Sequence, residues 1–144
     1  MPQTLITDSN PGEARWSNPD AQRRLTGAGN RAVEMVAAKL ARPARIACSP
    51  YVRARETASI VGKYHNAMEV IGVSQRLLPG TPPTDATGEL DQPELLCVTH
   101  QPLISRWIEF LTDEQVAMDP AWVAVLEAPG YGAGCARLIE VITP

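Results

Sequence analysis

The segment Arg45–Ala58 contains a junction between a short apolar strand and a helix, and this junction limits the possible folds of the chain more than any other segment does. The apolar run stops at Ser49-Pro50, and a helical pattern that carries Arg53 and Arg55 follows at once. An arginine in the first turn of a helix is well placed to hold a phosphate, because its guanidinium can engage two oxygens and the helix start adds partial positive charge. The junction therefore indicates an anion site. A capped surface helix whose arginines only solvate it is the alternative.

Strand and helix patterns alternate along the rest of the chain. Runs of apolar and β-branched residues predict strands, and apolar residues spaced three and four apart predict helices with one buried face. The predicted strands are Thr4–Thr7, Arg45–Cys48, Glu69–Gly72, Leu95–Val98, Trp122–Glu127 and Ala136–Ile142. The predicted helices run from Gly27 to about Leu40, from the Ser49-Pro50 turn to about Val61 with Gly62 near the end, and from Pro102 to about Leu111. Polar residues 84–93 are predicted as a loop, with one helical turn as the alternative.

This order of elements predicts an α/β fold: a three-layer α/β/α domain with a central, mostly parallel mixed sheet. The continuous apolar run Leu95–Val98 is typical of a central strand covered on both faces. The last two strands have no helix between them, so we expect an antiparallel C-terminal hairpin at one edge of the sheet. At 144 residues, the chain 1–144 is expected to form a single domain.

Composition narrows the range of partners. The 13 basic and 16 acidic side chains give a net charge of -3 without any block of like charge, which argues against nucleic acid and polybasic membrane partners. No secretory signal pattern opens the chain and no apolar run reaches the length of about 18 residues that spans a bilayer, so a cytoplasmic protein is expected. The three cysteines, Cys48, Cys97 and Cys135, are expected to be buried, reduced thiols. No metal and no cofactor is expected.

Polar groups follow three of the predicted strands. Ligands of open α/β sheets bind outside the carboxyl ends of the strands, so Asp8–Gly12, Ser49 with Arg53, and His100 are expected along one rim. His100 emerges from the apolar strand just before a helix that starts with proline; a purely structural histidine is the alternative. The other histidine, His65, is predicted to be a surface residue that favours the dipole of a helix end.

Four segments, in order, resemble the histidine phosphatase superfamily (phosphoglycerate mutase-like), and within it the small SixA-type phosphohistidine phosphatases. They are Leu25–Gly29, Ser49–Ala54 with Thr57, Val98–Leu103 and Gly134–Leu138. The resemblance implies a phosphate pocket in which Arg53 matches the second arginine and His100 the second histidine of the family. It also implies phosphoryl transfer to a histidine in an Arg-His-Gly motif at the end of the first strand.

That Arg-His-Gly motif is degenerate in this chain. Aligning Gly12-Glu13-Ala14 with the family's Gly-x-Ala puts Asn10 where the arginine is expected and Pro11 where the nucleophile is expected. Proline has no nucleophilic side chain, so covalent catalysis through that position is impossible. Asp8, if it points inward, would weaken phosphate binding further. The departures imply a pseudophosphatase.

The resulting hypothesis is a non-catalytic protein that binds phosphate, or a phosphorylated protein or small molecule, through Ser49, Arg53 and His100, with Arg55 peripheral. One alternative is an active phosphohistidine or phosphomonoester phosphatase with a relocated nucleophile, either His100 or Asp8. Another is a protein-interaction scaffold with a vestigial pocket. Trp16, in the polar loop, either lines the pocket or packs the loop down. The oligomeric state is left open.

Overall fold

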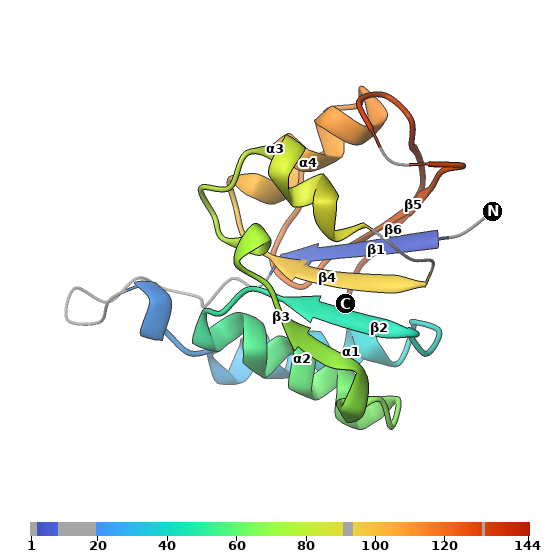
Figure 1. The fold of residues 1–144 in the computed structure, drawn as a ribbon. Coiled ribbons are helices and arrows are strands. Elements are labelled where there is room, and N and C mark those ends of the chain that lie inside the picture. The colour runs from blue at the N-terminus through green and yellow to red at the C-terminus, as the bar shows by residue number, and fades with distance from the viewer. Residues whose placement is uncertain (1–2, 9–19, 91–93, 131) are drawn as a thin grey trace.

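The computed structural model describes residues 3–8, 20–90, 94–130 and 132–144, which form a six-stranded sheet between two layers of helices (Figure 1). The strands are β1 (Gln3–Asp8), β2 (Arg45–Cys48), β3 (Ile71–Val73), β4 (Leu95–Thr99), β5 (Val123–Glu127) and β6 (Arg137–Ile142). The α-helices are α1 (Gly27–Ala37), α2 (Val52–Tyr64), α3 (Pro83–Ala86) and α4 (Leu103–Thr112). Short 3-10 turns are η1 (Asp20–Gln22), η2 (Met68–Val70), η3 (Gln75–Leu77) and η4 (Thr87–Glu89).

The sheet has the strand order β3-β2-β4-β1-β5-β6. The first four of these strands are parallel, and β5 is antiparallel to both β1 and β6. The predicted mixed sheet with an antiparallel edge hairpin is therefore confirmed. The last pair between β1 and β4 joins Asp8 to Thr99, so β1 ends beside the residue that precedes His100.

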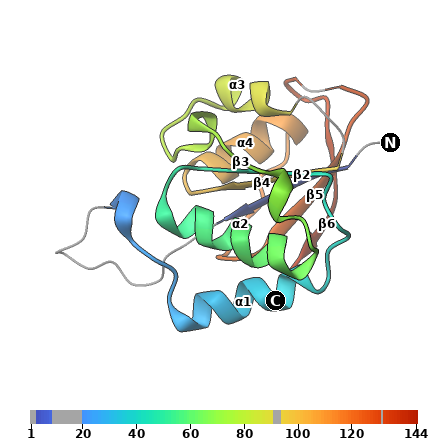
Figure 2. The same cartoon turned by 60° about the horizontal axis from the view of Figure 1, so that its bottom comes forward.

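Two hydrophobic cores lie on opposite faces of the sheet. Helices α1 and α2 cover one face and α3 and α4 the other, as the two views show (Figures 1 and 2). Strand β4 is buried along its whole length: Leu95 and Cys97 join the core under α4, while Leu96 and Val98 join the core under α1 and α2. This alternation follows from the two-residue period of a strand and confirms that β4 is covered on both faces.

Two helix ends differ from the prediction. Helix α1 ends at Ala37 rather than near Leu40, although Leu40 remains buried. Helix α2 continues past Gly62 to Tyr64. At Gly62 an added Cβ would lie 2.8 Å from Ile71 Cδ1 and 3.0 Å from Met68 Sδ, so this glycine serves the close packing of α2 and does not end it.

Short helical turns lie on both sides of β3 and along its connection to β4. Residues Met68–Val70 form a 3-10 turn, so β3 begins at Ile71 instead of Glu69. Of the predicted loop, residues 84–89 belong to α3 and η4, so the alternative of a helical turn is the one observed. Pro83 lies in the first turn of α3, where proline is tolerated. The Thr87 hydroxyl at the start of η4 accepts a hydrogen bond of 3.1 Å from the Trp107 indole, which fixes this connection against α4.

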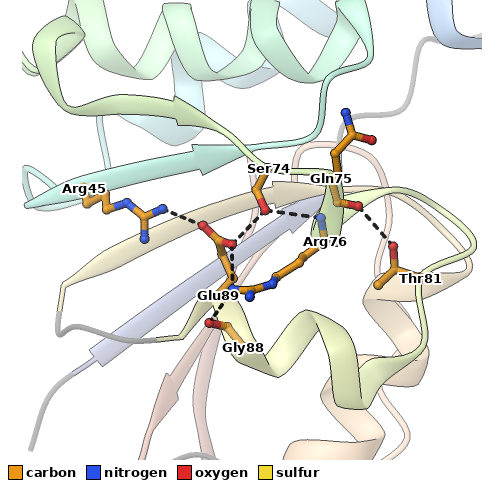
Figure 3. A network of polar contacts seen from close by, with 7 residues as sticks. All are labelled: Arg45, Ser74, Gln75, Arg76, Thr81, Gly88 and Glu89. Carbon is orange, nitrogen blue, oxygen red and sulfur yellow. Dashed lines mark hydrogen bonds and ion pairs between the residues drawn. The ribbon is translucent and has the colours of Figure 1, made fainter.

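A buried carboxylate joins this connection to the sheet (Figure 3). Glu89, with only 6% of its surface exposed, lies 2.5 Å from an Arg45 nitrogen of β2 and accepts a hydrogen bond of 2.7 Å from the Ser74 hydroxyl. Arg76 lies 3.8 Å from the same carboxylate and also donates to the Gly88 carbonyl. The connection from β3 to β4 is thereby held across the edge of the sheet.

The three thiols have different surroundings. Cys48 and Cys97 are buried, as predicted. Cys135 was also expected to be buried, but it is exposed because it lies in the segment before β6. None of the three cysteines, all within the described residues, forms a disulfide bond. Within the described ranges, every helix is too short or too polar to cross a bilayer.

Candidate functional site

The centre of the site is a contact between the ends of β2 and β4. Ser49 follows β2, His100 follows β4, and the Ser49 backbone N–H donates to the Val98 carbonyl at 3.0 Å. The Ser49 Oγ atom lies 2.6 Å from His100 Nε2. Both residues are buried, with exposed fractions of 0% and 1%. The Tyr51 backbone N–H also donates to Ser49 Oγ, at 3.2 Å, so this hydroxyl serves two partners, as its acceptor and donor capacity allows.

Tyr51 joins Arg53 to His100. Its ring centroid lies 4.8 Å from that of His100, with the rings tilted by 43°, and the Arg53 guanidinium carbon lies 5.0 Å from the same centroid. A guanidinium at this distance from an aromatic face is attracted by the ring quadrupole. The structure therefore brings Arg53 and His100 together at one aromatic ring, with Ser49 hydrogen-bonded to His100. The sequence interpretation missed the role of Tyr51, although its position between Ser49 and Arg53 was a usable signal.

Arg53 and Arg55 have opposite surroundings. Arg53 is buried in the first turn of α2, and its carbonyl accepts a hydrogen bond of 2.9 Å from the buried Thr57 hydroxyl one turn later. Arg55 is exposed, because residues two apart on a helix point to different sides. The peripheral position predicted for Arg55 agrees with this arrangement.

The end of β1 completes the rim. Its backbone reaches Asp8, opposite Thr99, which places the start of the next segment near His100. The side chain of Asp8, the Asn10-Pro11-Gly12 segment and Trp16 lie outside the described residues.

His65 lies far from the rim. It caps the carboxyl end of α2, twelve residues after Arg53, or about 18 Å along the helix. It is half-buried, and its Nε2 lies 2.8 Å from the Ala37 carbonyl at the end of α1, so it is more than a surface residue.

Neighbouring backbone contacts support the rim from behind. The Thr99 hydroxyl donates to the Leu77 carbonyl at 2.8 Å, and the Ser74 N–H donates to the Cys48 carbonyl, also at 2.8 Å. The connection that Glu89 fastens to the sheet therefore contacts the residues directly before Ser49 and His100.

Cys48 lies behind Ser49 as an unreactive thiol. Burial raises the pKa of Cys48 from 9.0 to about 11, and the positive charge of Arg55 offsets this only in part. In the part of the chain that the structure describes, no group of three or more His, Cys, Asp or Glu side chains is arranged to hold a metal ion.

No family model matches the sequence, and no curated protein matches it either. Solved structures do match. The protein histidine phosphatase SixA complexed with tungstate has 20% sequence identity and a TM-score of 0.84, over 99% of this chain and 97% of that one. A protein assigned as the phosphohistidine phosphatase SixA of Agrobacterium tumefaciens has 18% identity and a TM-score of 0.83, over 99% and 98%.

A more distant match is the phosphoserine phosphatase of Entamoeba histolytica in complex with phosphoserine, with 14% identity and a TM-score of 0.71, over 98% of this chain and 96% of that one. At these identities the likeness is one of fold. The chain has the fold of the SixA-type histidine phosphatases over almost its entire length.

Proposed function

We propose that this protein binds phosphate, or a phosphorylated partner, in the pocket formed by Ser49, Arg53 and His100, and that it does not hydrolyse the bound group. The observation that carries the proposal is the convergence of Arg53 and His100 on the Tyr51 ring at the rim of the parallel strands. Those are the two residues that match the family's phosphate pocket. The remaining half of that pocket is replaced by Asn10 and Pro11 in the sequence.

The chemistry of the pocket suits an oxyanion. Arg53 supplies a permanently charged planar group that can donate to two oxygens, and Ser49 and His100 supply further hydrogen-bonding groups close by. The first turn of α2 adds the partial positive charge of a helix N-terminus, which the side chain of the N-cap residue Tyr51 does not cap.

The lack of turnover is proposed from the histidine content of the chain. Only two histidines occur, and His65 is at the far end of α2. His100 directs its Nε2 at Ser49 Oγ, so an attack on phosphorus through this nitrogen would first have to break a hydrogen bond of 2.6 Å. Pro11 offers no replacement nucleophile.

The solved neighbours support an anion as the ligand. One is complexed with tungstate, a tetrahedral oxyanion like phosphate, and another is complexed with phosphoserine. Because the chain has their fold, the equivalent rim is the place to expect a tetrahedral anion here.

Thermal unfolding in increasing concentrations of inorganic phosphate tests binding. A ligand selective for the native state raises the melting temperature, by about 2–4 °C for each kcal/mol of stabilisation in a chain of this size. We expect this rise in the wild type and in Arg106→Gln, which removes an exposed arginine on α4, and we expect it to be lost in Arg53→Gln. No rise at tens of millimolar phosphate would instead favour the scaffold.

Hydrolysis of p-nitrophenyl phosphate tests the alternative hypothesis, an active phosphatase with a relocated nucleophile. The proposal expects the wild type and His100→Ala to release nitrophenol at the same background rate. A wild-type rate well above background that His100→Ala abolishes would establish a phosphatase with a relocated nucleophile.

A further inference from the structure

A groove of about 370 Å³ lies between α1 and α2, which pack side by side (Figure 2). One stripe of α2 forms its length, and Asn30 of α1 contributes to it. The stripe follows the three- and four-residue spacing of a helix face: Val52, Arg55, Glu56, Ser59, Ile60 and Lys63. Val52 and Ile60 give the groove apolar surface, while Asn30 and Ser59 give it polar surface.

The groove is basic although the chain is acidic overall. Arg55 and Lys63 line it and are exposed, and neither forms an ion pair with another described residue. The carboxylate of Glu56 is already engaged: it lies 3.6 Å from Arg24 and accepts a hydrogen bond of 3.1 Å from the Leu25 N–H. Two uncompensated positive charges therefore face the groove in a protein of net charge -3.

The groove starts at the helical turn that also carries Arg53, although Arg53 and Arg55 point to different sides of α2. Val52 and Arg55 belong to the same first turn of α2 as Arg53. The charge of Arg55 also acts on the Cys48 thiol, which lies directly before Ser49. A polypeptide with its phosphate beside Arg53 would meet the groove within a few residues.

The distance between the two charges suits an extended chain. Arg55 and Lys63 are eight residues apart on a helix, or about 12 Å. In an extended peptide, side chains four residues apart point to the same side and are about 13 Å apart. Two acidic residues at this spacing would reach both charges at once.

We propose that the α1/α2 groove binds an acidic segment of the polypeptide that carries the phosphorylated residue, with carboxylates paired to Arg55 and Lys63. This inference rests on the proposed phosphate-binding function and names the class of its partner. An extended polypeptide fits better than a compact anion, because the groove combines two separated charges with apolar and amide-bearing walls.

Fluorescence anisotropy with two labelled peptides tests this inference. The acidic peptide has a phosphoserine at its centre and, on each side of it, two aspartates spaced four residues apart. The neutral peptide has asparagine in place of each aspartate. Each peptide is also used with an unphosphorylated serine. The proteins are the wild type, Arg55→Gln/Lys63→Gln, and the matched control Lys39→Gln/Arg106→Gln, which removes two exposed charges outside the groove.

We expect the acidic phosphopeptide to bind the wild type and the control more tightly than the neutral one, by about three- to tenfold, as two exposed ion pairs allow. The preference should disappear in Arg55→Gln/Lys63→Gln and weaken in about 0.5 M NaCl. Equal binding of the two phosphopeptides, or a preference that survives the groove variant, would overturn the inference. Displacement of the acidic peptide by an equally charged DNA oligonucleotide would overturn the choice of a polypeptide partner.

The two experiments distinguish a failure of acidic-peptide binding in the groove from a failure of the proposed phosphate binding. If the groove inference alone is wrong, inorganic phosphate still raises the melting temperature, but the flanking charges have no effect. If phosphate binding is wrong, the unphosphorylated acidic peptide binds as tightly as the phosphorylated one.

Discussion

The Oγ atom of Ser49 and the Nε2 atom of His100 lie 2.6 Å apart, although 51 positions separate the two residues in the chain. The parallel pairing of β2 with β4 makes this contact possible, since it aligns Cys48 with Val98 and so places the two strand ends side by side. The contact joins two of the residues that we propose to bind phosphate, and it engages the His100 nitrogen that an alternative nucleophile would need.

Replacing Ser49 by alanine should destabilise the fold and weaken phosphate binding. The substitution removes the hydrogen-bond partner of both His100 Nε2 and the Tyr51 N–H in a buried site, which typically costs about 1–3 kcal/mol of the free energy of unfolding. Urea denaturation of Ser49→Ala measures this cost. The matched control, Ser105→Ala, removes a hydrogen bond to Gln101 near the surface and should cost less than 1 kcal/mol. An equal loss of unfolding free energy in the two variants would show that the buried Ser49–His100 contact stabilises the fold no more than the Ser105–Gln101 contact does.

Glu89 should contribute far more to stability than a carboxylate in an exposed pair. Glu89→Gln removes the charge between Arg45 and Arg76, and we expect a loss of about 1–3 kcal/mol, reduced from the value for a fully buried pair because both arginines are partly exposed. Glu69→Gln, which breaks the exposed pair with Arg42, should cost less than about 1 kcal/mol. Chemical denaturation of both variants decides the comparison, and a cost for Glu69→Gln equal to that for Glu89→Gln would contradict it.

Cys48 should make stability fall in alkaline solution. Its pKa is raised from 9.0 to about 11 in the folded protein, so between these values the native state keeps a proton that the unfolded state has lost. The contribution is fully present below pH 9 and is lost as the pH rises towards 11, by up to about 1.4 kcal/mol for each pH unit. Stability curves of the wild type and Cys48→Ala between pH 8 and 11 measure it. Parallel curves would show that the thiol does not titrate in this way.

Much of the fold could be predicted from the spacing of apolar residues and from the turn residues that end each strand and helix. The apolar run Leu95–Val98 and the Ser49-Pro50 turn each mark a strand end, and their order along the chain predicts the parallel sheet on whose rim Ser49, Arg53 and His100 meet. The resemblance to the histidine phosphatases identified Arg53 and His100 as candidate phosphate-binding residues. The solved neighbours confirm the fold it implied.

The remaining features depend on contacts between distant parts of the chain. From the sequence, Glu89 is predicted to be an ordinary polar residue in a loop. Its burial depends on the hydrogen bond from Arg45, 44 positions earlier. Gly62 reads as a helix end, yet close packing against Ile71 and Met68 lets the helix continue. Tyr51 could be noticed in sequence, but its contact with His100 arises only when β2 and β4 pair. Local patterns do not contain such tertiary information.

Phosphorus NMR of a phosphohistidine peptide mixed with the protein shows both whether the protein binds the phosphoryl group and whether it hydrolyses it. We predict that the peptide resonance shifts or broadens on addition of wild-type protein but not of Arg53→Gln, while inorganic phosphate appears no faster than in a protein-free sample. Faster release of inorganic phosphate that is lost in His100→Ala, or a resonance unchanged by the wild type, would contradict the proposed binding of phosphate without hydrolysis.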